Sequence, residues 1–171
     1  FIGDVVGGAG VAMLEQQVPR LRGLHEPHFL VVNAENAALS GENPMHGAGM
    51  APSDLDRLFA LGVDVITGGN HSWDGPHAAE VLSRPRVLRP MNYGRAAAGC
   101  GAVIVGEPGR RLGVVNLASR TAMAYADTPH DALQAQLRTW QASAEPPDLV
   151  LVDLHGEPVS EKQIFAFAVA G

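Results

Sequence analysis

The stretch Val63-Asp-Val-Ile-Thr-Gly-Gly-Asn-His-Ser-Trp-Asp74 joins a short apolar run to a polar loop. The run Val63–Thr67 is rich in β-branched residues, which is typical of a strand that is covered on both faces. Two glycines then allow a sharp turn, and Asn70, His71 and Asp74 follow them. A buried strand that ends in carboxamide, imidazole and carboxylate groups indicates an α/β protein with a site at the edge of its sheet.

Similar runs on both sides of this stretch predict further strands, and segments with helical spacing separate most of them. Strands are expected at Phe29–Asn33, Ala102–Val105, Leu112–Leu117 and Leu149–Leu154, with Phe1–Asp4 as the end of another. Helices are expected at Val11–Arg22, Ser53–Leu61, Pro76–Ser83 and His130–Ala144, and a last one opens with Ser160. The alternation favours parallel pairing in the first half of the chain.

Three local signals refine this pattern. Pro19 is expected to kink or split the first helix, because proline lacks the N–H of a helical hydrogen bond. Ser53 and Ser160 are expected to cap the helices that they open. Glu107–Arg110 is expected to turn between two strands that have no helix between them, which predicts a hairpin or a second sheet.

Length and composition exclude several classes of protein. The 171 residues, 46% of them hydrophobic, suit a single domain over 1–171. A net charge of -6 disfavours a nucleic-acid-coating or membrane-surface role, and the apolar run Ile164–Ala170 is too short to span a bilayer. The lone Cys100 cannot form an internal disulfide. We therefore expect a cytoplasmic protein with no membrane contact and no stable nucleic-acid complex, while a homo-oligomer stays open.

Polar side chains follow four of the expected strands at the point where each strand ends. They are Asp4 after the first, Glu35 and Asn36 after Phe29–Asn33, Asn70 and His71 after Val63–Thr67, and His155 after Leu149–Leu154. Carboxylate, amide-oxygen and imidazole ligands together suit manganese, iron or zinc. Two such metal ions, roughly 3.5–4 Å apart, commonly bind a phosphoester during its hydrolysis. A bridging carboxylate is then needed, and Glu35 is the natural candidate.

At these residues the sequence resembles a known family. The strings that carry the resemblance are Phe1-Ile-Gly-Asp-Val-Val-Gly7, Asn33-Ala-Glu-Asn-Ala-Ala38, Thr67-Gly-Gly-Asn-His-Ser-Trp-Asp74, Arg89-Pro-Met-Asn92 and Asp153-Leu-His155. They resemble the bacterial YmdB-like family of calcineurin-like metallophosphoesterases, described as 2',3'-cyclic-nucleotide phosphodiesterases. The resemblance extends in order from Phe1 to Ala170.

The resemblance implies a fold, a metal centre and a reaction. The fold would be a four-layer α/β/β/α sandwich around two divalent metal ions (iron, manganese or zinc). Asp4 and Asn36 would bind one ion, Glu35 would bridge both, and Asn70 and His155 would bind the second. His71 would be the general acid in the attack of an activated hydroxide on a small phosphodiester, a 2',3'-cyclic nucleotide above all.

The sequence departs from the wider superfamily at three points. Val6 stands where a first Asp-x-His motif would have its histidine, and Asn-Ala-Glu-Asn replaces a bridging aspartate. Both departures resemble the YmdB-like branch. The family also has a downstream Gly-x-His-x-His motif, and the sequence ends at Gly171 before it. We therefore expect a domain that is truncated at both ends and incomplete at its C-terminus.

Two alternatives stay open at this point. The glycine-rich Gly3-Asp-Val-Val-Gly-Gly-Ala-Gly10, with Glu35 after the next strand, is compatible with a dinucleotide-binding oxidoreductase domain. Met13, however, occupies the position of the third glycine in that motif. The second alternative is a non-catalytic module that binds a partner through the same cleft.

Overall fold

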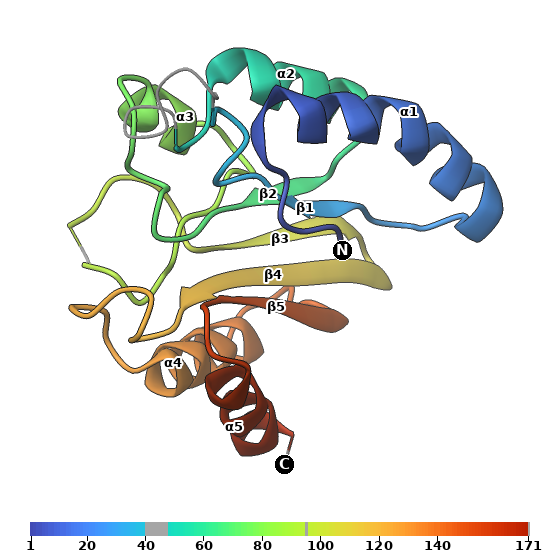
Figure 1. Ribbon diagram of the computed structural model, residues 1–171. Coiled ribbons are helices and arrows are strands. Elements are labelled where there is room, and N and C mark those ends of the chain that lie inside the picture. Colours follow the sequence, from blue (N-terminus) through green and yellow to red (C-terminus); the bar gives the residue numbers. More distant parts are fainter. Residues whose placement is uncertain (40–47, 95, 171) are drawn as a thin grey trace.

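The computed structural model describes residues 1–39, 48–94 and 96–170 (Figure 1). The helices in these ranges are α1 (Gly7–His25), α2 (Pro52–Ala60), α3 (Ala78–Leu82), α4 (Pro129–Gln141) and α5 (Val159–Val169). The strands are β1 (Val31–Asn33), β2 (Val65–Thr67), β3 (Ala102–Glu107), β4 (Arg110–Ala118) and β5 (Leu149–His155). Each strand that the sequence predicts at 29–33, 63–67, 102–105, 112–117 and 149–154 is therefore present.

The strands form two sheets. In the first, β1 and β2 run parallel, with Val32 opposite Ile66. Single bridges from Ile2 and Val87 extend it on either side, so the expected strand at Phe1–Asp4 is reduced to one bridge. In the second sheet β4 pairs antiparallel with β3 and parallel with β5. The predicted turn at Glu107–Arg110 thus closes a hairpin within a second sheet.

Alternation along the strands builds four layers. Val31 and Val65 face the second sheet, where they pack with Leu112 and Val114. Their neighbours Val32 and Ile66 point to the opposite face and pack against the helices on that side, as the two-residue period of a strand requires. On the far side of the second sheet, β4 packs against Leu133 and Trp140 of α4.

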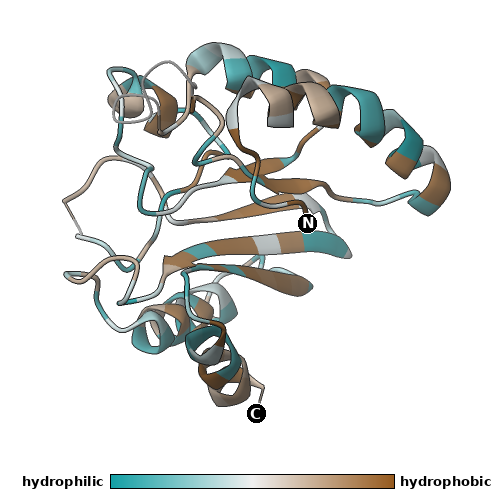
Figure 2. Ribbon diagram, viewed as in Figure 1, coloured by the Kyte–Doolittle hydropathy of each residue, from teal (hydrophilic) through white to brown (hydrophobic). Residues whose placement is uncertain are grey.

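The result is an α/β/β/α arrangement. In Figure 1, α1, α2 and α3 lie above the first sheet, and α4 and α5 lie below the second. Figure 2 shows the hydrophobic residues concentrated in the strands between these helices. The mixed α/β fold and the α/β/β/α order of layers expected from the resemblance are confirmed. Within the described ranges, no helix combines the length and apolar character that crossing a membrane would demand.

The helix boundaries correct the predicted split of the first helix and two predicted caps, and the alternative of a kink at Pro19 stays a prediction. α1 continues through Pro19 and is not split there, because Val11, Leu14 and Val18 stay buried on one side of it. The N-cap of α2 is Ala51, so Ser53 does not cap it, and that of α5 is Pro158, so Ser160 lies inside the helix. Proline is favoured in the first helical turn, and Pro52 begins α2 one residue earlier than the serine signal predicts.

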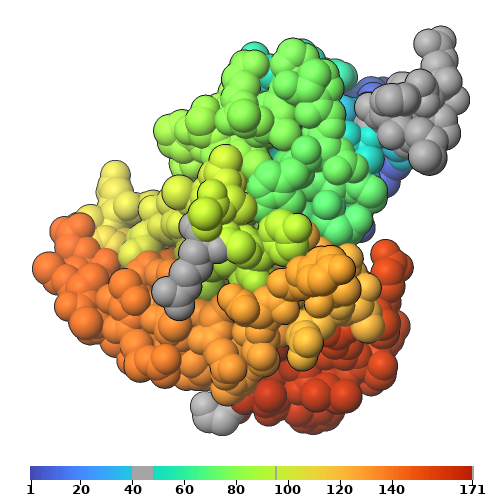
Figure 3. All heavy atoms as spheres, turned by 90° about the vertical axis from the view of Figure 1, so that its left-hand side faces the viewer, coloured from blue at the N-terminus to red at the C-terminus, as the bar shows by residue number. Residues whose placement is uncertain are grey.

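The carboxyl ends of β1, β2, β4 and β5 come together on one side of the molecule. Asn33 at the end of β1 and Thr67 at the end of β2 both contact Asp153 near the end of β5. Figure 3 views the molecule from this side, and the green surface of the residues after β2 lies above the orange and red surface of those after β4 and β5. The loops that carry the predicted site residues therefore share one face.

Candidate functional site

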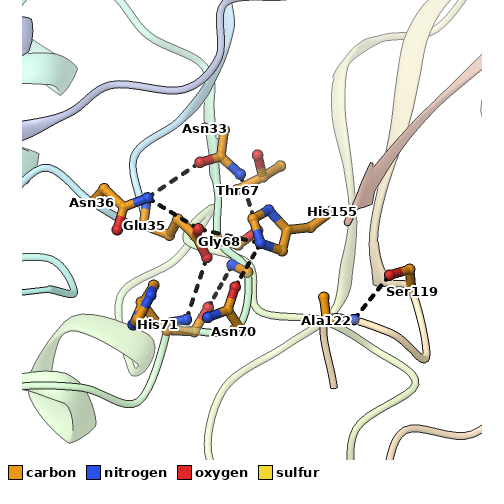
Figure 4. Close-up of polar contacts among 12 residues, drawn as sticks. Asn33, Glu35, Asn36, Thr67, Gly68, Asn70, His71, Ser119, Ala122 and His155 are labelled. Atoms are coloured by element: carbon orange, nitrogen blue, oxygen red, sulfur yellow. Dashed lines mark hydrogen bonds and ion pairs between the residues drawn. The ribbon is translucent and has the colours of Figure 1, made fainter. Parts of the chain in front are cut away.

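Glu35 is at the centre of the polar cluster on this face (Figure 4). Its side chain is only 2% exposed, although it follows β1 by two residues. Its Oε1 accepts a hydrogen bond from Nδ2 of Asn36 at 3.1 Å, and its Oε2 accepts one from the backbone N–H of His71 at 3.3 Å. A buried carboxylate with donors on both oxygens is fixed in orientation by segments after two different strands.

His155 brings the second sheet to the same point. It ends β5, and its side chain is 10% exposed. Its Nε2 lies 3.2 Å from Oε1 of Glu35 and 2.7 Å from Oδ1 of Asn70. Figure 4 shows the imidazole pointing from its strand toward both residues. Side chains from β5 and from the loops after β1 and β2 thus converge on one nitrogen.

His71 is placed differently from the other predicted residues. Its backbone N–H contacts Glu35, whereas its ring Nδ1 lies 2.7 Å from Oδ2 of Asp74. The ring is 39% exposed, so it is accessible from solvent. Nδ1 is engaged by a carboxylate, and Nε2 has no hydrogen-bond partner among the residues that the structure describes.

Asp4 has no direct contact with Glu35 among the described hydrogen bonds. The segment before α1 runs beside β1, where the N–H of Val5 donates to the carbonyl of Asn33 at 3.0 Å. Asp4 is exposed and lines a pocket together with Asp153 and His155. All six predicted site residues therefore lie on one face, five of them in a contacting cluster and Asp4 at its border.

Burial makes negative charge costly at this site. Burial raises the pKa of Glu35; His155 and the backbone N–H of His71 oppose the rise, and Asp4 adds to it. Burial also raises the pKa of Asp153, against hydrogen bonds from Thr67 and Asn33. Removing carboxylates from water disfavours their charged form, so a bound cation would recover part of that cost.

The donor set fits a divalent metal. Two ligands that each lie about 2.1 Å from one ion are about 3 Å apart, and the contacts of His155 Nε2 with Glu35 and Asn70 have this spacing. Over the described ranges, no three His, Cys, Asp or Glu side chains gather closely enough to hold an ion. Of the proposed ligands in the contacting cluster, only Glu35 and His155 are of those types, and the carboxamides of Asn36 and Asn70 supply the other oxygens.

Three further polar residues, Asp153, Thr67 and Asn116, lie beside the cluster although the sequence assigned them no role. Asp153 accepts hydrogen bonds from Thr67 Oγ1 at 2.5 Å and from Asn33 Nδ2 at 3.2 Å. Asn116 of β4 accepts one from the backbone N–H of Gly68 at 3.1 Å. One signal was available for Asp153: it precedes His155 by two residues in a strand, so both side chains share a face.

The match to a protein family covers the whole chain. The family model of YmdB-like proteins matches residues 1–171. The chain belongs to the YmdB-like family. A relative from Bacillus subtilis (strain 168), named 2',3'-cyclic-nucleotide 2'-phosphodiesterase, is 36% identical over 163 residues, which cover 95% of this chain and 58% of that protein.

Solved structures agree with this YmdB-like assignment. A crystal structure of a protein from Thermus thermophilus superposes with a TM-score of 0.82 at 31% identity, covering 96% of this chain and 60% of that one. A structure described as a novel phosphatase from Mycoplasma pneumoniae superposes with a TM-score of 0.83 at 27% identity, covering 99% and 58%. This YmdB-like chain thus spans about three-fifths of the length of the relatives it matches.

The glycine-rich segment of the oxidoreductase alternative has a packing role in the YmdB-like fold. A Cβ on Gly10 would lie 3.1 Å from Cγ1 of Val5, so this glycine lets α1 approach the segment before it. Asn70, His71 and His155 also remain without a role in a dinucleotide-binding domain. The cluster at the strand ends favours the metal-site interpretation.

Gly69 is the backbone position on which this cluster depends most closely. A Cβ at Gly69 would lie 1.9 Å from Oε2 of Glu35 and 2.6 Å from Cγ of His155. We expect Gly69→Ala to lower the free energy of unfolding by about 1–3 kcal/mol, as overpacking does, and to separate Glu35 from His155. Urea unfolding measures the change.

Gly23→Ala is the matched control, since a Cβ there meets nothing within 4 Å and the residue lies in α1. Alanine is a better helix former than glycine, so this control is expected to be neutral or stabilising by up to about 1 kcal/mol. A Gly69→Ala protein as stable as the Gly23→Ala protein would contradict the close packing at the site.

Proposed function

We propose that this chain carries the greater part of a dinuclear metal-dependent phosphodiesterase site that hydrolyses 2',3'-cyclic nucleotides. The observation that carries the proposal is the convergence of Glu35, Asn70 and His155 from both sheets. An accessible imidazole, that of His71, lies beside them. The name of the Bacillus subtilis relative supports the substrate class.

The proposed ligands are those at the strand ends. Glu35 would bridge two ions, with Asp4 and Asn36 on one side and Asn70 and His155 on the other. When bound, the ions would lower the pKa of a coordinated water and neutralise charge on the phosphoryl oxygens. Manganese, iron and zinc all suit a set of carboxylate, amide and imidazole donors.

His71 would supply the proton for the leaving ribose oxygen. Its Nδ1 faces Asp74, so Nε2 is the nitrogen that carries this proton toward the cleft. Protonation of the leaving group lets the cyclic phosphodiester open to a monoester without a free alkoxide. The backbone N–H of His71 holds Glu35 at the same time, which keeps acid and ligand in a fixed relation.

A hydrolysis assay with purified protein, Mn²⁺ and a 2',3'-cyclic nucleotide tests the proposal. The expected result is a metal-dependent product with one phosphomonoester, which chelation of Mn²⁺ abolishes. Binding of Mn²⁺ and nucleotide without any hydrolysis would instead favour the non-catalytic binding module. Binding of a nicotinamide dinucleotide would support the oxidoreductase alternative.

Asp74 is expected to orient the general acid. In Asp74→Asn the carboxylate that faces Nδ1 of His71 becomes an amide, and the ring loses a charged partner at 2.7 Å. The contact is half-exposed, so we expect about a 5-fold lower kcat, corresponding to a hydrogen bond worth ~1 kcal/mol. Steady-state kinetics should show little change in KM.

Glu80→Gln provides a control for Asp74→Asn, since Glu80 faces an exposed histidine, His77, at 3.5 Å in the same i,i+3 relation. It should leave kcat unchanged. An unaltered kcat in Asp74→Asn would show that this carboxylate does not orient His71 during turnover.

A further inference from the structure

One partly buried carboxylate at this site has a set of hydrogen bonds that the proposed function does not use. Asp153 lies between the two sheets, in β5, two residues before His155. Its Oδ2 accepts hydrogen bonds from Thr67 of β2 at 2.5 Å, Asn33 of β1 at 3.2 Å and Asn116 of β4 at 3.5 Å. This one oxygen therefore accepts hydrogen bonds from donors in three other strands.

The donors to Asp153 also hold the loops that carry the proposed ligands. Asn33 donates to the carbonyl of Gly68 at 3.0 Å and accepts from the backbone N–H of Glu35 at 3.3 Å. Asn116 accepts from the N–H of Gly68 at 3.1 Å. Both backbone groups of Gly68, two residues before Asn70, are thus fixed by side chains that reach Asp153.

The other contacts between the two sheets are mainly apolar and do not have the directionality of these hydrogen bonds. The two sheets otherwise meet through Val31, Val65 and Leu88 on one side and Leu112 and Val114 on the other. Apolar burial is non-directional and specifies poorly how far one sheet slides along the other. Hydrogen bonds have narrow geometry, so those from Asn33 and Thr67 to Asp153 define the relative position of the strand ends.

Stability alone gives a weak reason for this arrangement. Asn33, Thr67 and Asn116 are each at most 1% exposed, and apolar residues of similar volume could fill this space. No Lys or Arg pairs with Asp153 in the described ranges, so its charge is balanced only by neutral donors and by nearby His155. Buried polar networks are retained in some proteins because they specify one arrangement, even where apolar packing would be as stable.

We propose that Asp153 is a positioning residue that sets the carboxyl ends of the two sheets relative to each other, so that His155 meets Glu35 and Asn70. Asp153 does not contact the substrate in this proposal. The inference rests on the proposed function in one respect: that these three residues bind metal. The position of His155, which the proposal says depends on Asp153, can be measured in metal-free protein.

Asp153→Leu and Asp153→Asn test the proposal in two measurements on the purified protein. Calorimetric titration gives the Kd for Mn²⁺, and ¹⁵N NMR of the imidazole ring reports the hydrogen bonding of His155 in metal-free protein. Loss of an outer partner of a metal site commonly costs about 10- to 100-fold in affinity, which is the loss expected for Asp153→Leu. Asp153→Asn keeps an acceptor oxygen and is expected to stay within about 3-fold of the wild type.

Asp148→Leu is the matched control, because Asp148 lies just before the other end of β5 and accepts from the backbone N–H of Arg111 at 2.6 Å. It should leave both the Mn²⁺ affinity and the His155 signals unchanged. If Asp153→Leu does not fold, Thr67→Val removes the shortest bond to Asp153 with little change in volume. The His155 signals should then shift toward those of a free imidazole.

The outcomes separate the two proposals. A folded Asp153→Leu protein with wild-type Mn²⁺ affinity and unchanged His155 signals would overturn the positioning role, as would unchanged signals in Thr67→Val. An Asp153→Asn protein as impaired as Asp153→Leu would also overturn it, because charge rather than geometry would then decide. If the wild type binds no Mn²⁺, the proposed function fails, and the His155 signals alone decide the role of Asp153.

Discussion

Replacing His71 with alanine is expected to lower turnover of a 2',3'-cyclic nucleotide by about 10²- to 10⁴-fold, the usual contribution of a general acid. The bound metal per chain should stay the same. The reason is the geometry of His71: its ring contacts Asp74, and only its backbone N–H contacts Glu35. Truncating the ring removes the proton donor and leaves that N–H in place.

Steady-state kinetics and metal analysis of the same samples measure the two effects. His77→Ala is the control, since His77 is an exposed histidine that contacts Glu80 rather than the cluster. It should change neither quantity. Loss of metal from the His71→Ala protein would place His71 among the ligands, and wild-type turnover would remove it from the mechanism.

The part of the fold that the sequence predicts is the part that rests on local pattern. Val63–Thr67 is apolar and β-branched, and it forms the buried strand β2. The polar residues after the strands are expected at one sheet edge; Glu35 and His155 do meet, but they come from two sheets, Glu35 after β1 of the first and His155 at the end of β5 of the second. A short-range rule therefore predicts that these residues share one face of the molecule, and their roles stay a prediction.

The part that could not be predicted depends on packing between distant segments. The sequence predicts Asn33 only as the last residue of a strand, yet its side chain donates a hydrogen bond to Asp153, 120 positions away in the chain. Pro19 reads as a helix breaker, but the packing of α1 on the first sheet keeps the helix continuous. Local propensity is overridden in both cases by contacts that no short window of sequence contains.

Replacing Glu35 with glutamine separates the effect of this carboxylate on metal binding from its effect on stability. Glu35→Gln is expected to weaken Mn²⁺ binding by at least about 100-fold, since it removes the charge of the proposed bridging ligand and not merely an outer partner. Glutamine keeps an oxygen for the N–H groups of Asn36 and so preserves much of the packing. Calorimetric titration with Mn²⁺ measures the loss.

Metal-free Glu35→Gln protein is expected to be more stable than wild type at neutral and alkaline pH. Burial raises the pKa of Glu35, so the folded state binds more protons than the unfolded state between the ordinary and the raised pKa. The free energy of unfolding of the wild type therefore falls as pH rises through this window. Glutamine does not titrate, so the contribution of Glu35 to this fall in the free energy of unfolding disappears. The contribution of Asp153 remains, because burial raises its pKa as well.

Asp54→Asn is the control for Glu35→Gln, because it removes a carboxylate with a raised pKa that is not a proposed metal ligand. Burial raises the pKa of Asp54 as well, against the opposing charge of Arg57, but this residue lies in α2, outside the cluster. Its substitution should flatten the pH dependence of urea unfolding in the same direction and leave Mn²⁺ binding intact. If Glu35→Gln were destabilising at every pH in metal-free protein, the charge on Glu35 would be compensated by its neighbours. The burial of this carboxylate would then have no cost for a metal ion to recover.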